Sequence, residues 1–258
     1  KWDIAGAAIA TVIGNIAGAM YYIIYFLKGE STLSISIKDF TLKEGTCFKV
    51  LSIGIPASLG SLLMSISQIM VNGMMTSYGD MALAGIGVAM KVTMITSMIC
   101  IGFAQGVQPL LGYCVGANLQ DRFKKVMKFS LIFSFALSVT MTGLCYIFTE
   151  SIVSVFLSDL EALSYGIDFS RILLSTSFLF GIFYVFVNAL QAIGAATPAL
   201  IINISRQGLI YIPALFIMES MIGINGLLWA QPVADILSTI LVVVLYRHTI
   251  LKMNKDNY

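Results

Sequence analysis

Charged residues are scarce in this amino-acid sequence. Asp, Glu, Lys and Arg make up 11% of its 258 residues, whereas a soluble domain averages about 25%. Apolar residues make up 58%, and the mean hydropathy is +0.92. This shortage of charge excludes an ordinary soluble domain and predicts a membrane protein that has the lipid bilayer as its surroundings. A net charge of +2 with dispersed basic residues also argues against a nucleic-acid surface.

Residues that bind metals or carry out catalysis are also few. The sequence has one histidine, His248, and four widely separated cysteines without a CxxC pair, which are Cys47, Cys100, Cys114 and Cys145. Because no His or Cys partner stands at metal-ligand spacing, we expect neither a metal site nor a redox role. The sequence contains no phosphate-binding loop, zinc signature or catalytic nucleophile with a base. We therefore expect no enzyme activity and no cofactor.

Seven apolar segments are long enough to cross a bilayer, which takes roughly 20 residues. They are residues 3–27, 50–77, 81–113, 129–148, 172–193, 198–218 and 222–246. This pattern predicts an all-α integral membrane protein. The longest polar interruption, residues 28–49, separates one apolar segment from a group of six.

This grouping suggests two six-helix bundles joined by a linker. We expect residues 1–27 to be the last helix of a first bundle, 28–49 the linker, 50–247 a six-helix bundle and 248–258 a tail. The first residue is Lys rather than Met, and the first apolar segment lacks the layout of a signal peptide. We therefore expect a chain that begins partway through a longer protein.

Lys and Arg are concentrated in alternate connections between the predicted spans. The basic connections and end contain Lys28, Lys38, Lys43 and Lys49, then Arg122, Lys124, Lys125 and Lys128, and finally Arg247, Lys252 and Lys255. The intervening connections contain Asp80, Glu150, Asp159, Glu161, Asp168 and Glu219, with Arg171 as a basic exception. Since short cytoplasmic loops carry an excess of Lys and Arg, we expect the linker and the C-terminus in the cytoplasm.

Three charged residues fall inside the predicted spans, where an ionised side chain costs about 2.5 to 3.5 kcal/mol. Asp235 is a cation or proton site, a gate that changes partner as the protein switches conformation, or a buried carboxylate that is already paired. If Asp235 is a buried carboxylate, its partner is Lys91, Arg206 or the helix ends near Pro232. Lys91 is either a counter-ion or a lining residue of a water-filled cavity. Arg206 lies about two turns inside its span, so we expect its side chain to extend toward the cytoplasmic interface.

Amides and methionines gather in the second and third spans. Gln68 and Asn72 stand four apart on one helical face, where they either join helices by hydrogen bonds or orient a substrate. Met64 and Met94 belong to a larger methionine group in these spans. Methionine either adapts to different ligands or packs against helices and lipid.

The segment GFAQGVQPLLGYCVGANLQDRFKK, residues 102–125, predicts a helical bend followed by a cytoplasmic loop. Pro109 lacks an amide donor, so the carbonyl of Gln105 loses its helical partner, and Gly106 leaves room for a bend. We expect Gln105 or Gln108 to satisfy the freed carbonyl, with direct substrate contact as the alternative. The bend is then a candidate for a moving part.

Several motifs in this chain resemble the second half of the multidrug and toxic compound extrusion (MATE) transporters. Gly54 and Pro56 match the Gly-x-Pro that opens the seventh helix of that family. The family element GxQPxxGYNxGA is matched at Gly106, Gln108, Pro109, Gly112, Tyr113, Gly116 and Ala117. The segments NALQAIGAATPALIINISRQGLIYIPALFI and GINGLLWAQPVADILS look like its tenth to twelfth helices.

The resemblance implies that residues 50–247 are helices 7 to 12, which face an N-terminal lobe across a central cavity. It further implies a cell-membrane antiporter that exports amphipathic organic cations in exchange for Na⁺ or H⁺ as the lobes rock. The candidate cavity residues are Met64, Gln68, Asn72, Lys91, Met94 and Asp235. The candidates for conformational or structural roles are Pro56, Gln108, Pro109, Arg206 and Pro232.

Departures from the family pattern refine this expectation. Cys114 stands where the family often has Asn, and Met64 and Phe180 stand where the NorM-type branch has acidic residues. The chain therefore resembles the MepA-type or DinF-type branches, in which an acidic residue of helix 1 often carries coupling. The alternatives are a flippase of a lipid-linked substrate from the same broad superfamily and a non-transporting membrane scaffold.

Overall fold

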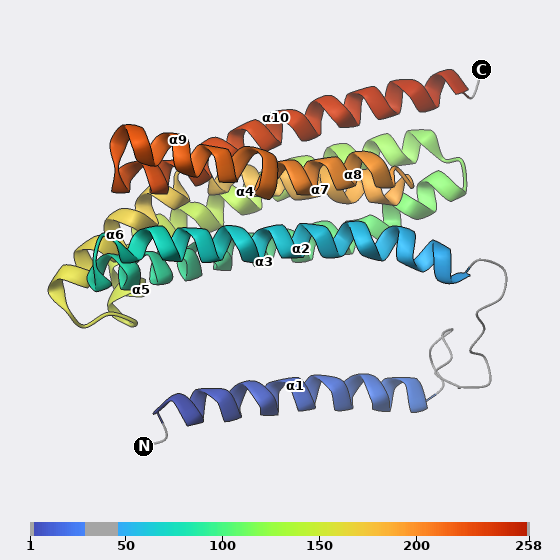
Figure 1. Ribbon diagram of the computed structural model, residues 1–258. Coiled ribbons are helices and arrows are strands. Elements are labelled where there is room, and N and C mark those ends of the chain that lie inside the picture. Colours follow the sequence, from blue (N-terminus) through green and yellow to red (C-terminus); the bar gives the residue numbers. More distant parts are fainter. Residues whose placement is uncertain (1–2, 29–45, 257–258) are drawn as a thin grey trace. The chain divides into compact units, whose positions relative to one another are not determined.

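The computed structural model describes residues 3–28 and 46–256, without the side chains of residues 3–5, 7, 46–57, 61, 196 and 252–256. The chain divides into two compact units, residues 1–52 and 53–258, which we describe separately. In the first unit, α1 (Asp3–Leu27) is a single long helix. Figure 1 shows the helices of the second unit running up and down beside one another.

All regular elements of the described residues are helical. The chain continues from α1 as α2 (Thr46–Thr76), α3 (Asp80–Gly116), α4 (Gln120–Ile147), α5 (Thr149–Ser154), α6 (Leu160–Leu174), η2 (Ser177–Leu179), α7 (Phe180–Ala192), α8 (Ala196–Ile204), η3 (Ser205–Tyr211), α9 (Ile212–Ile222) and α10 (Ile224–Asp256). The helices η2 and η3 are short 3₁₀ and π turns, respectively. Each continues directly into an α-helix, so α6 to α7 and α8 to α9 form two long segments.

Six helical segments of the described residues are long and apolar enough to cross a membrane. They are Ala8–Leu27, Asp80–Gly116, Gln120–Ile147, Leu160–Ala192, Thr197–Ile222 and Ile224–Leu251. The sequence predicted a span at each of these places, and α2 occupies the remaining predicted span, 50–77. The all-α membrane fold expected from the sequence is therefore confirmed.

The ends of the helices differ from the ends of the apolar runs. Helix α4 begins at Gln120, well before the predicted start at residue 129, and α10 continues to Asp256, past the predicted end at residue 246. Backbone hydrogen bonds can continue a helix beyond the apolar stretch, and charged residues there remain in water. Residues 29–45 of the predicted linker lie outside the described residues.

The charges of the second unit are separated between its two ends. The turns after α3 and α7 and the end of α10 lie together in Figure 1, opposite the turns after α2, α5 and α9. The first end carries Arg122, Lys124, Lys125, Lys128 and Arg247, and the second carries Asp80, Glu150, Asp159, Glu161 and Glu219. The basic and acidic connections that alternate along the sequence therefore lie at opposite ends of the second unit. Which end faces the cytoplasm stays a prediction.

Pro109 does not end α3, which remains helical from Asp80 to Gly116. In the part of the chain that the structure describes, neither Gln105 nor Gln108 makes a side-chain hydrogen bond. The expected capping of the freed carbonyl by one of these amides is therefore absent there. The helix ends where Asn118 adopts a left-handed backbone, with φ of 54°, and the Leu119 amide donates to the Cys114 carbonyl at 2.8 Å.

Helices α4 and α7 approach each other closely through small residues. Ser130, Ser134 and Ser138 form a buried stripe on α4 at four-residue spacing. The Ser134 hydroxyl donates to the Gly181 carbonyl at 3.1 Å, and the Ser138 hydroxyl donates to the Phe178 carbonyl at 2.7 Å. Small residues that let backbones come together, with hydroxyls bonding across the contact, are typical of membrane helix pairs.

We expect Gly181→Ala to destabilise the chain by about 1–3 kcal/mol, because a β-carbon there would collide with the backbone carbonyl of Ser134. Thermal unfolding of the purified chain in detergent measures the change. Gly102→Ala is the matched control, since a β-carbon at Gly102 would meet nothing within 4 Å. Equal melting temperatures for the two variants would contradict this account of the α4 and α7 contact.

Candidate functional site

A cleft of about 420 Å³ opens within the second unit. Residues of α2, α3, α6, α7, η3 and α10 line it. Five of the six predicted cavity residues are among them, namely Met64, Gln68, Asn72, Lys91 and Met94. The sixth, Asp235, lies behind the lining residues Arg206 and Gln231, to which it is hydrogen-bonded. The structure thus brings these positions together, and their role in binding stays a prediction.

The charged centre of the cleft wall is an ion pair between η3 and α10. Arg206 donates to Asp235 Oδ1 through Nη2 at 2.8 Å and through Nε at 3.1 Å. The side chains are 12% and 2% exposed. Gln231, one turn before Asp235 on α10, donates to the same oxygen from Nε2 at 3.1 Å. Three donors therefore converge on one carboxylate oxygen in an environment with little water.

The other oxygen of the carboxylate is differently placed. Asp235 Oδ2 is buried and has no hydrogen-bond partner among the described residues, and the same is true of the Thr176 hydroxyl. Thr176 stands in the short break between α6 and η2, inside the span Leu160–Ala192. A buried acceptor without a donor is costly. The carboxylate is therefore held mainly through Oδ1, while the Thr176 hydroxyl lies near enough to Asp235 to interact with it.

Aromatic rings surround the Arg206 guanidinium. Its central carbon lies 4.8 Å from the ring centroid of Phe183, 5.4 Å from that of Phe180 and 5.7 Å from that of Tyr184. Nη1 also donates to the Tyr184 hydroxyl at 3.1 Å. A cation over aromatic faces is attracted by the ring quadrupole, more strongly where water is excluded. The rings of α7 thereby help to hold Arg206 in place.

The π turn η3 and a serine of α2 connect this centre to the rest of the cleft. Arg206 is the second residue of η3, and a π turn leaves carbonyls without their usual α-helical donors. The hydroxyl of Ser67, which is buried on α2, donates to the Gln207 carbonyl at 3.0 Å. Helix α2 is therefore tied to the turn that carries Arg206.

One expectation about the intramembrane charges proves wrong, and one alternative that the sequence left open is not realised among the described residues. Arg206 does not extend toward an interface, because Asp235 and Tyr184 hold it inside the helix bundle. Lys91 is not the partner of Asp235. Its Nζ instead lies 5.4 Å from the ring centroid of Phe156, and among the described residues no carboxylate forms an ion pair with it. Of the partners that the sequence left open for Asp235, the structure selects Arg206.

The amides of α2 lie on one face of the helix, as their spacing predicts. Gln68 donates from Nε2 to Asn72 Oδ1 at 3.2 Å and to the Met90 sulfur at 2.9 Å. The contact with Met90 connects α2 to α3. Both amides are exposed, so they retain polar capacity for a further partner.

The remaining candidates lie elsewhere in the fold. Pro56 lies in α2, and its side chain is not among those that the structure describes. Gln108 and Pro109 lie in α3 and do not line the cleft. Pro232 is buried in α10 next to Gln231. Sequence reasoning missed Tyr184 and Gln231. The four-residue spacing of Gln231 and Asp235 was a usable signal, but nothing in sequence placed Tyr184 beside Arg206.

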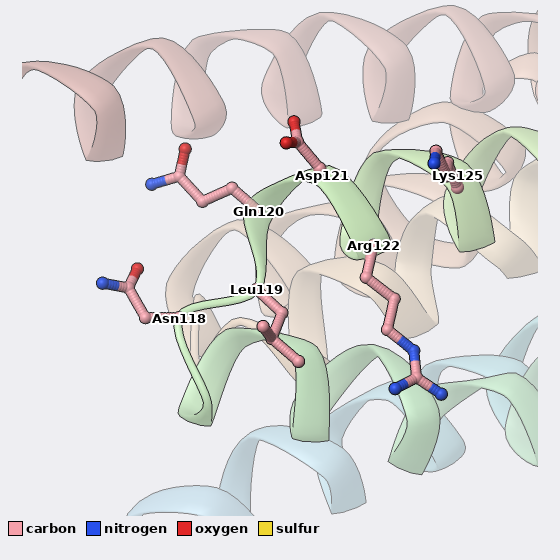
Figure 2. Close-up of a pocket in the computed structure, with 6 residues that line it drawn as sticks. All are labelled: Asn118, Leu119, Gln120, Asp121, Arg122 and Lys125. Atoms are coloured by element: carbon pink, nitrogen blue, oxygen red, sulfur yellow. The ribbon is translucent and has the colours of Figure 1, made fainter.

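A second hollow, of about 680 Å³, lies on the loop between α3 and α4 (Figure 2). Its lining residues are Asn118, Leu119, Gln120, Asp121, Arg122 and Lys125, and all six are exposed. In Figure 2 the Asn118 and Gln120 side chains point the same way and Arg122 points away from them. The side chains do not converge, so the smaller cleft is the better candidate for a functional site.

The fold and cleft define a class: a polytopic helical membrane protein with a polar and methionine-lined cavity between its spans, as membrane transporters have. A family model described as MatE matches residues 56–217. The chain belongs to this family, as its motifs indicated.

Sequence relatives agree with this assignment. Multidrug export protein MepA of Staphylococcus aureus (strain NCTC 8325 / PS 47) is 31% identical over 248 residues, which is 95% of this chain and 54% of the relative. Multidrug export protein MepA of Staphylococcus haemolyticus (strain JCSC1435) is 30% identical over 237 residues, 90% of this chain and 51% of the relative. The chain therefore spans about half the length of these relatives.

Solved structures agree on the fold. The MATE multidrug transporter DinF-BH in complex with R6G is 32% identical, with a TM-score of 0.79, over 96% of this chain and 56% of that one. A MATE structure in complex with MaL6 has a TM-score of 0.85 over 98% of this chain and 58% of its own, at 20% identity. At that lower identity the likeness concerns the fold alone.

We expect Asp235→Asn to destabilise the chain by about 3–5 kcal/mol, because it leaves the buried Arg206 without a counter-charge. The double variant Arg206→Met with Asp235→Leu should recover most of this loss, since it removes both charges. Thermal unfolding in detergent measures both. The control Asp121→Asn, an exposed carboxylate without an ion pair among the described residues, should change stability by less than about 0.5 kcal/mol. If Asp235→Asn behaves like this control, the pair is not structural.

Proposed function

We propose that this chain is the C-terminal lobe, helices 7 to 12, of an ion-coupled multidrug exporter, preceded by the last helix of the N-terminal lobe. The exporter would carry amphipathic organic cations out of the cell in exchange for Na⁺ or H⁺. The observation that carries the proposal is the cleft, where five predicted cavity residues meet in a chain of the MatE family. Two lobes would alternate around such a cleft, exposing it to one side and then the other.

The relatives support this class of substrate. The curated relatives carry the name multidrug export protein, and DinF-BH, at 32% identity, was solved with R6G. In the present chain the cleft offers methionines, exposed amides and aromatic rings. Flexible thioethers and aromatic faces suit ligands of varied shape, because they repack at little cost. This combination fits a site that accepts several drugs rather than one metabolite.

The described residues of this lobe offer no free carboxylate for ion coupling in the cleft. Met64 and Phe180 occupy the positions at which the resemblance places acidic residues in one branch, and Asp235 is held by Arg206. We therefore propose that the principal coupling carboxylate belongs to helix 1 of the complete transporter.

We also propose that the basic end of the second unit faces the cytoplasm, as the excess of Lys and Arg there favours.

A flippase for an anionic, lipid-linked substrate is the second candidate, because two cations line the cleft. Asp235 neutralises one of them, Arg206, which leaves Lys91 as the free charge among the described lining residues. A multiply charged headgroup would require more. The exporter is accordingly the better-supported function.

To test the function, the complete transporter that contains this chain is expressed in a drug-sensitive host, and accumulation of cationic dyes is measured. We expect lower accumulation when an inward Na⁺ or H⁺ gradient is imposed. Gly87→Leu should reduce export several-fold by filling the cleft, while Gly102→Leu should not. A β-carbon meets nothing within 4 Å at either glycine of α3, and only Gly87 lines the cleft. If the accumulation of several dyes is the same with and without an imposed Na⁺ or H⁺ gradient, the proposal is rejected.

We further expect the 258-residue chain alone to give no ion-driven dye transport in liposomes. Alternating access requires an opposing lobe, which by this proposal lies outside the sequence. Dye flux is compared with and without an imposed Na⁺ or H⁺ gradient. Gradient-driven flux by the chain alone would show that the described helices form a complete pathway.

A further inference from the structure

We infer that Lys91 is a specificity-determining residue that binds an acidic group of the transported molecule. This inference rests on the proposed export function and defines its substrates more narrowly. The ligand class is an amphipathic zwitterion, which carries a carboxylate or similar anionic group in addition to its cationic end. Three features of the molecule point to this role: Lys91 lies inside a membrane span, it has no anionic partner among the described residues, and the cleft has no acidic lining residue.

Lys91 lies within the membrane-spanning helix α3. It is the twelfth residue of a helix that begins at Asp80, so its backbone is about 16 Å along the axis from that end. This position is inside the candidate membrane span Asp80–Gly116, which at 37 residues is longer than a hydrocarbon core of about 30 Å requires. A charged residue inside a span is costly in lipid, so Lys91 is expected to face a polar cavity and to have a function.

The ammonium group has no anionic partner among the described residues. Among the side chains that the structure describes, the ion pair of Arg206 with Asp235 is the one salt bridge, and Lys91 takes no part in it. Lys91 instead lies over the ring of Phe156, a contact worth about 0.5–1 kcal/mol at exposed sites. That contact uses the ring face and leaves the ammonium donors free. Lys91 is exposed and lines the cleft, so a ligand can reach it.

The charge balance of the cleft favours an anion. No Asp or Glu is among the lining residues of the described cleft. Arg206 is neutralised by Asp235, which stands behind it. The cleft wall therefore carries one uncompensated positive charge, at Lys91. In a medium of low polarity such a charge repels a ligand cation placed beside it and attracts a carboxylate.

The rest of the cleft suits the remainder of such a ligand. Met64 and Met94 supply apolar surface, and the exposed amides Gln68 and Asn72 supply further hydrogen-bonding groups. A volume of about 420 Å³ falls within the range of about 300–1,000 Å³ for small-molecule sites. The aromatic ring of Tyr184, also in the lining, could receive a cationic end. A zwitterion would thus place its acid at Lys91 and its cation on π faces.

Two dyes that differ at one group test this inference. Rhodamine 110 has a free carboxylate, and rhodamine 123 is its methyl ester, so the second dye lacks the anion. Their dissociation constants are measured by fluorescence polarisation with the full 258-residue chain in phosphatidylcholine nanodiscs. The variants are Lys91→Met, which removes the charge, and Lys91→Arg, which keeps it. Lys128→Met, an exposed lysine of α4 outside the cleft, is the matched control.

We expect Lys91→Met to weaken binding of rhodamine 110 roughly tenfold, which is the size of a lost charge-assisted hydrogen bond. Binding of rhodamine 123 should stay the same or become tighter, which also shows that the variant is folded. Lys91→Arg should keep the wild-type preference, and Lys128→Met should change nothing. Weaker binding of both dyes to the same degree, or of neither, would overturn the inference and leave the proposed function standing. Binding of neither dye by the wild-type chain would count against both.

The acidic group of a lipid could compete for the same ammonium. Repeating the rhodamine 110 measurement in nanodiscs with phosphatidylglycerol separates the two sources. Competition that disappears in Lys91→Met would identify the lipid phosphate as an acidic group bound by Lys91. Unchanged affinity in the anionic lipid would assign the contact to the carboxylate of the small molecule.

Discussion

The second unit depends on one buried charge pair. Arg206 and Asp235 come from two helices that are separated in sequence, and neither side chain could be buried alone at an acceptable cost. Their contact joins η3 to α10, and the aromatic rings of α7 close around the guanidinium. Helix α10, which carries Asp235, contributes Ala234 to one hydrophobic cluster and Val242 to another. The pair therefore fixes η3 to a helix that belongs to both parts of the core.

The cleft takes its character from this arrangement. Asp235 is hydrogen-bonded behind the cleft wall and is not a lining residue. The aromatic and amide neighbours of the ion pair therefore line the cleft, but its negative charge does not. Helix α2 is fixed to the same centre through Ser67 and the Gln207 carbonyl. The amides of α2 thus face α3 and Lys91 across the opening. A transporter lobe of this kind combines a rigid charged anchor with an adaptable surface of methionines beside it.

Much of the fold could be predicted from sequence, because apolar length and charge alternation are local signals. The helices of all predicted spans are present, and the cavity candidates on α2 and α3 meet in one cleft. The partner of Asp235 could not be predicted, since Lys91 and Arg206 are both cations within spans and sequence does not show which helices touch. The break at Thr176 and the π turn at Arg206 also escaped prediction, because an unbroken apolar run conceals changes of helical geometry.

The π turn has a consequence for how the face of this span is oriented. In a regular α-helix the buried stripe that contains Ile202 would return near residues 209 and 213. Leu209 is instead 69% exposed, and the buried positions are Tyr211 and Leu215. The extra residue of the turn shifts the helical phase, so the span presents one face before Ser205 and a rotated face after it. A single helical wheel drawn for the whole span would therefore place Leu209 in the protein interior, although its side chain is exposed.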